Sequence, residues 1–111
     1  MKSRPQKPPV PSVKDDTVRH AIIKLLSKET VSALDISREV RVAEREIYGH
    51  LEHIRRTLST AGLHLRVVPA ECRECGFVFH KRTRLTKPGK CPACRSSYIS
   101  EPFFSIAEDG T

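Results

Sequence analysis

The stretch Cys72-Arg-Glu-Cys75-Gly-Phe-Val-Phe-His-Lys-Arg-Thr-Arg-Leu-Thr-Lys-Pro-Gly-Lys-Cys91-Pro-Ala-Cys94 holds all four cysteines of this 111-residue chain. They form two C-x2-C pairs on either side of residues 76–90, a spacing typical of a four-thiolate metal site. Each pair can curl around one ion, and two pairs brought face to face supply the tetrahedral sulfur shell that Zn²⁺ accepts. The pattern predicts one metal site made by these four thiols.

We expect the metal to be a single structural Zn²⁺, with iron as the alternative. A ribbon of roughly 35 residues is too small to bury a stabilising core, and metal binding, at about 10–16 kcal/mol in small zinc modules, would supply the missing free energy. Tetrahedral sulfur suits both metals. The chain has no Trp and few aromatic residues to shield a redox centre, which favours zinc.

Two disulfides would use the same cysteines, but they require an oxidising compartment. Residues 1–13 are basic and rich in proline and lack the apolar region of a signal peptide. No apolar run approaches the roughly 18 residues of a membrane span. We therefore expect a soluble, cytoplasmic protein with reduced thiols and no membrane partner.

The net charge of +7 and the pI near 9.6 point to an anionic partner, most often nucleic acid. Residues 15–62 carry balanced charges, so the excess lies in the N-terminal arm and in the cysteine region. We expect duplex DNA as the partner. An RNA or protein partner and a homodimer are left open.

Apolar residues at helical spacing predict a first helix over residues 15–28. Ser32 followed by Asp35 resembles a capping box and predicts a second helix from there to residue 40. After a short turn, a third apolar stripe predicts a helix over residues 44–61, with Gly62 as its C-cap. An alternating segment over residues 63–68 then predicts a half-buried strand.

Three helices with a short turn before the last are typical of a helix-turn-helix core. The run from Val42 to Ile54, followed by Gly62 and Leu63, resembles the turn and recognition helix of winged-helix repressors. With the cysteine motif included, residues 15–105 resemble prokaryotic, chiefly archaeal, predicted transcriptional regulators that fuse a helix-turn-helix domain to a zinc ribbon.

This resemblance implies an α+β fold, with a three-helix winged-helix-like helix-turn-helix core followed by a small three-stranded zinc ribbon. It also implies sequence-specific DNA binding in transcription control. The sequence departs from the pattern at Arg41 and Arg95, each of which stands where a glycine is common, and at Ala43, which lacks a capping hydroxyl. The expected divisions are a flexible basic arm over residues 1–13, the winged-helix-like domain over 14–69, the ribbon over 70–105 and a flexible tail over 106–111.

Candidate nucleic-acid contacts fall into two groups. Those near the third helix are Arg41, Arg45, Tyr48 and His53, although Glu44 and Glu46 in its first turn would repel phosphates. The second group is a basic run that we expect at a hairpin tip, with a solvated loop as its alternative interpretation. That run comprises Lys81, Arg82, Arg84, Lys87 and Lys90.

Four aromatic side chains are expected to pack the core of the ribbon: Phe77, Phe79, Tyr98 and Phe103. The alternative, a platform on which single-stranded bases stack, requires them to be exposed together.

We find no catalytic constellation, and so expect no enzyme. His50 and His53 lie three residues apart on the expected third helix, but two ligands are too few for a metal site. Two other functions remain as alternatives to a DNA-binding regulator. One is a protein- or RNA-binding adaptor of the transcription or translation machinery that uses the ribbon, and the other is a rubredoxin-like iron redox protein.

Overall fold

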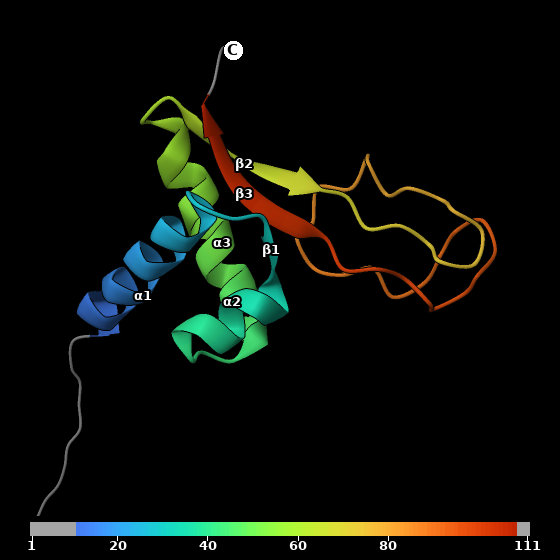
Figure 1. The fold of residues 1–111 in the computed structure, drawn as a ribbon, viewed down its shortest axis with the longest axis horizontal. Helices are drawn as coiled ribbons and strands as arrows, with labels where there is room; N and C mark the ends of the chain where they lie inside the picture. The colour runs from blue at the N-terminus through green and yellow to red at the C-terminus, as the bar shows by residue number, and fades with distance from the viewer. Residues whose placement is uncertain (1–10, 109–111) are drawn as a thin grey trace, which may run out of the picture.

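A computed structural model describes residues 11–108 of the chain (Figure 1). Most of the expected basic arm therefore lies outside the described residues, as does the end of the expected tail. In chain order the elements are α1 (Pro11–Leu26), β1 (Val31–Ser32), α2 (Ala33–Val40), α3 (Glu44–Ser59), β2 (Leu63–Val68) and β3 (Phe103–Glu108). Residues 11–108 thus form three helices and one small sheet, and the fold class is mixed α and β.

The three helices form where the apolar spacing predicts them, with shifted ends. α1 begins at Pro11, because proline is well suited to the first turn of a helix. α2 begins at a complete capping box, in which the Ser32 hydroxyl accepts from the Asp35 amide and the Asp35 carboxylate accepts from the Ser32 amide. α3 ends at Ser59 rather than at residue 61, and Gly62, at φ +75°, turns the chain into β2.

The sheet is antiparallel, with strand order β1-β3-β2. β3 pairs along its whole length with β2, from Val68 opposite Phe103 to Leu63 opposite Glu108. The expectation of a flexible tail from residue 106 is therefore wrong as far as residue 108, because Phe104 in β3 is fully buried and holds the strand in the core. The cysteine segment lies between two paired strands, as residues 69–102 (Figure 1).

The hydrophobic core lies where the three helices meet the inner face of the sheet. Its fully buried members include Ile22, Leu26, Ile36, Ile47, Leu51, Ile54 and Phe104. Leu85, from the inserted segment, joins the same cluster and is only 3% exposed. None of the helices within residues 11–108 is both long and apolar enough to cross a membrane.

The inserted segment contains less regular strand than predicted. Its backbone pairing consists of two isolated bridges, Glu71 with Val78 and Cys72 with Ile99. The three-stranded sheet of the structure is therefore the one beneath the helices, and not a sheet of the ribbon.

The prediction that four aromatic residues form the ribbon core is also wrong. Tyr98 is 60% exposed, Phe77 and Phe103 are 38% exposed, and Phe79 is half-buried. The buried positions of the ribbon are instead Ala70, Cys72, Leu85, Pro88, Cys91, Ile99 and Pro102. A metal-centred module needs little apolar core, because the bonds to the metal hold its segments together.

Candidate metal centre and nucleic-acid interface

The two C-x2-C segments adopt the same backbone turn. The amide of Gly76 donates to the carbonyl of Cys72 at 2.8 Å, and the amide of Arg95 donates to the carbonyl of Cys91 at the same distance. Gly76 has φ +83° and Arg95 has φ +67°, so both lie in the left-handed region. Each turn curls its pair of cysteines around a common centre, which explains why a glycine is usual at this position.

The four thiols converge on one point. Sγ of Cys72 lies 3.5 Å from Sγ of Cys94, Sγ of Cys75 lies 3.6 Å from Sγ of Cys91, and all four sulfurs lie within 4.8 Å of one another. A tetrahedral shell with metal–sulfur bonds of ~2.3 Å has sulfurs about 3.8 Å apart. The cysteines are free thiols. They form a metal-binding site, and their donor chemistry and spacing fit a four-thiolate ion.

Packing four thiols so closely separates their pKa values. The backbone amide of Cys75 lowers the pKa of Cys72 to about 7. At Cys94 the amide of Ser96 lowers the pKa, but partial desolvation and the neighbouring sulfurs outweigh it and raise the pKa to about 12. The metal-free cluster therefore retains protons at neutral pH, and a bound cation would displace them.

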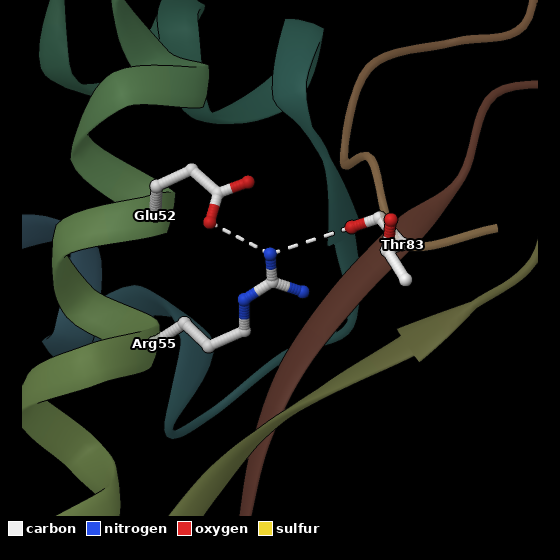
Figure 2. A network of polar contacts seen from close by, with 3 residues as sticks. All are labelled: Glu52, Arg55 and Thr83. Atoms are coloured by element: carbon white, nitrogen blue, oxygen red, sulfur yellow. Dashed lines mark hydrogen bonds and ion pairs between the residues drawn. The ribbon is translucent and has the colours of Figure 1, made fainter.

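The basic run does not form a free hairpin tip, because its middle is fastened to the helices. Nη2 of Arg55 on α3 donates to the carbonyl oxygen of Thr83 at 3.3 Å and lies 2.6 Å from Oε1 of Glu52 (Figure 2). Two residues further along, Leu85 enters the core. The run thus lies beside α3, while the cysteine turns extend away from it (Figure 1).

Four of the five basic side chains in the run are solvent-exposed: Lys81, Arg84, Lys87 and Lys90. Arg82 is half-buried, and its guanidinium donates to the carbonyl of Thr86 at 3.2 and 3.1 Å and to the Thr86 hydroxyl at 3.1 Å. The four exposed cations are more open to an anionic partner than Arg82 is.

The helical candidates have unequal access to solvent. Arg45 is exposed in the first turn of α3, and His53 is half-buried on the same helix. Arg41 is exposed at the C-cap of α2, where its φ of +60° is left-handed. The structure therefore leaves Arg41 and Arg45 open to a partner.

Tyr48 is held within the protein. Its side chain is half-buried against the core, and its hydroxyl donates to Oε2 of Glu44 at 3.3 Å. Burial, followed by the charge of Glu44 and the hydrogen bond to it, raises the pKa of Tyr48 to about 12. The nearby carboxylate of Glu101, from the ribbon, acts in the same direction. This places Tyr48 at the contact between α3 and the ribbon.

Sequence reasoning missed one polar contact. His50 is buried on α3, and its Nδ1 accepts a hydrogen bond from Nε of Arg19 on α1 at 3.2 Å. The available signal was position, because residue 50 falls on the apolar stripe with Ile47 and Ile54. The pair therefore helps to pack α1 against α3, and the role of His50 in the fold is structural.

Two family models match consecutive parts of the chain. Residues 17–66 match the PF0610-like N-terminal domain, and residues 69–109 match the PF0610 rubredoxin-like zinc beta-ribbon domain. The solution NMR structure of protein PF0610 from Pyrococcus furiosus is 29% identical in sequence, with a TM-score of 0.72, and the match covers 96% of this chain and 100% of that one. No curated protein matches the chain. The chain is thus similar, over residues 17–66 and 69–109, to a PF0610-like N-terminal domain followed by a PF0610 rubredoxin-like zinc ribbon.

Proposed function

We propose that the protein is a sequence-specific regulator of transcription that binds duplex DNA through α3 and carries one structural Zn²⁺ in its ribbon. The order of the elements supports a winged-helix-like domain. Three helices are followed by the strand pair β2 and β3, with β1 added to its edge. The ribbon then takes the place of the wing tip between β2 and β3.

The observation that carries the proposal is the solvent face of α3. Arg45, Gly49 and Arg56 are exposed and recur at four and seven residues, so they share one side of the helix. Opposite them, the stripe from Ile47 to Leu58 is buried. The fold therefore uses one side of α3 for its core and leaves the other for a partner.

Gly49 supports close approach of that partner. A methyl group built at this position would meet no atom within 4 Å, so nothing inside the fold requires glycine here. Glycine within a helix costs about 1 kcal/mol relative to alanine. The missing side chain at Gly49 would let the helix backbone there approach the wall of the major groove, where recognition helices lie.

Arg41 supports the same surface. A residue other than glycine in the left-handed region costs roughly 1–2 kcal/mol, yet Arg41 adopts it with its side chain exposed. Arg41 lies in the turn between α2 and α3, three residues before α3 begins, and from there its guanidinium would contact a phosphate of the duplex.

Two observations favour zinc over iron. The four cysteines are the one cluster of metal-ligating side chains within residues 11–108, so a redox iron would have no second centre there to exchange electrons with. Only part of the sulfur shell is buried, so a redox centre would be poorly shielded from solvent. Cys72 and Cys91 are buried, whereas Cys75 and Cys94 are exposed. On this proposal the ion holds the ribbon together and takes no part in a reaction. Metal analysis of the purified protein, together with its visible absorption, separates the two ions, because a ferric thiolate site is coloured and a zinc site is not.

In vitro selection from a random duplex library tests the function. We expect a shared motif to be enriched, and Arg45→Ala to weaken binding to that motif by about ten- to a hundredfold, as the removal of one base contact does. Lys24→Ala removes the same charge from the exposed side of α1 and serves as the matched control. Failure to enrich any motif with fully metallated protein would refute sequence-specific binding and favour the adaptor role.

A further inference from the structure

We propose that the ribbon contains a second binding site, a hollow between Phe77, Phe79 and Pro92 in which an unpaired base of a single-stranded nucleic acid stacks. The site uses none of the residues on or next to α3 that we place at the duplex, and it shares only Lys81 with the exposed cations of the basic run. It therefore stands or falls independently of the function proposed for α3.

The aromatic wall of the hollow is formed by Phe77, which is exposed, and Phe79, which is half-buried. Phe77 and Phe79 meet edge to face, with ring centroids 5.0 Å apart and planes at 86°. In this arrangement the ring that offers its edge keeps both of its own faces uncovered by the other ring. The hollow has a volume of about 460 Å³, and apolar atoms form most of its lining. Small-molecule sites typically measure ~300–1,000 Å³, so one base fits.

The rim of the hollow carries positive charge. Lys81 and Arg82 line it beside the aromatic side chains. The three hydrogen bonds from Arg82 to Thr86 fix its guanidinium in place, so little side-chain entropy is lost when an anion approaches it. Residues 75–100 contain no acidic side chain at all. An occupant with negative charge along its length is therefore favoured.

An unpaired nucleotide combines the two features that this surface accepts. Its base offers a flat apolar face for the phenylalanine rings, and its phosphates offer charge for Lys81 and Arg82. In a duplex the base faces are stacked on one another, so a duplex could contact only the cations. The occupant is thus single-stranded DNA or RNA, and the two differ only at the sugar.

The chain contains no tryptophan, so Phe77→Trp creates a single fluorescent reporter within the hollow. We would titrate this variant, loaded with metal, with homopolymers of about 8 nucleotides, a length within the ~4–16 that single-strand-binding folds cover. We expect saturable quenching by oligo(dT) or oligo(U), and the comparison of the two identifies the preferred sugar. An abasic oligonucleotide of equal length and charge should quench far less.

The second readout is the affinity of single variants that do not carry the tryptophan reporter. Removing one stacking ring by Phe77→Ala should weaken binding of the preferred homopolymer by about ten- to a hundredfold. The control is Tyr98→Ala, because Tyr98 is more exposed, lies outside the hollow and is covered by Arg73 at 5.9 Å from its ring centroid. Bound metal is measured for each variant, so a misfolded ribbon is recognised.

Three outcomes would overturn the proposal. The first is equal quenching by the abasic oligonucleotide, which would mean attraction by charge alone. The second is an equal loss of affinity in the Phe77 and Tyr98 variants. The third is quenching by an acidic amphipathic peptide with no response to any oligonucleotide, which would make the hollow a protein-docking site. Duplex binding by α3 is unaffected by each of these, and its own test is Arg45→Ala.

Discussion

Nε of Arg19 on α1 donates a hydrogen bond to Nδ1 of His50 on α3, at 3.2 Å, and this bond requires a neutral imidazole. Burial, followed by the charge of Arg19, lowers the pKa of His50 below its usual 6.5, while Asp15 and Glu46 pull it upward. Folding therefore favours the deprotonated ring at this position.

The first prediction is a loss of stability on mild acidification. His50 is a base whose pKa is lowered in the folded state, so below pH ~6.5 the unfolded chain binds more protons than the folded one. Its contribution is present in full above that pH and is lost as pH falls through the lowered pKa. Urea unfolding between about pH 7.5 and 5 should show this decline. It should be smaller in His50→Gln and unchanged in His20→Gln, since His20 is exposed.

A second prediction concerns the left-handed residue of each cysteine turn. Arg95→Gly removes a strained φ and should stabilise the metallated protein by about 1 kcal/mol, whereas Gly76→Ala introduces the same strain and should destabilise it by a similar amount. No atom lies within 4 Å of a methyl group at residue 76, so a steric clash does not confound the comparison. Thermal unfolding at fixed zinc concentration measures both. Effects of the same sign in the two variants would contradict the idea that the turns are equivalent.

The third prediction separates stability from binding at Gly49. Gly49→Ala should stabilise the protein by about 1 kcal/mol, because helix propensity rises and the added methyl group meets nothing. If the helix surface approaches DNA closely, the same change should lower affinity for the selected duplex. Unfolding and fluorescence anisotropy on one preparation provide both numbers. An affinity equal to that of the unaltered protein would show that α3 makes no close approach there.

The fourth prediction concerns charge. Changing the four exposed cations of the basic run to Gln should flatten the salt dependence of duplex binding. The slope of log K against log salt should become less steep by about 3 to 4, at roughly 0.9 for each phosphate that is no longer neutralised. Those cations are Lys81, Arg84, Lys87 and Lys90. Arg82 is kept because its hydrogen bonds to Thr86 hold the loop. Persistence of the full salt slope would mean that the run is a solvated loop.

The fifth prediction is that metal affinity rises with pH. Thiol pKa values raised in the metal-free cluster, as at Cys94, mean that protons must leave when the ion binds. Competition with a chelator across a pH series measures this dependence, and proton release into a weak buffer gives an independent check. Cys94→Ser should lose most of the affinity, while Ser97→Ala, three residues away and exposed, should keep it.

Local signals in the sequence predicted the parts of the fold that local interactions determine. The capping box of Ser32 and Asp35 formed as expected, because both partners lie within one turn. The spacing of the cysteines predicted the metal cluster for the same reason, since each pair is set by one short turn.

The errors came from long-range packing. Nothing near Ile106 in the sequence reveals that it pairs with Leu65, across the whole ribbon. Leu85 stands among charged and polar residues, so its burial in the core of the helical domain was not anticipated. Phe77 and Phe79 look like core residues by type. The exposure of Phe77 and the partial exposure of Phe79 follow from a module in which thiolates replace apolar packing.

Residues 69–102 are inserted between the paired residues Val68 and Phe103. Metal binding therefore affects the closure of this loop as well as the folding of the ribbon. With the ion bound, the connection is short in effect, because the cysteines tie its two halves together. Without it, the chain must close a long flexible loop before β3 can pair with β2. The free-energy cost of closing a loop grows only slowly with its length, by ~0.6 kcal/mol for each doubling. Loss of the metal should therefore lower the free energy of unfolding of the helical domain only modestly, because the pairing of β3 with β2 becomes less favourable.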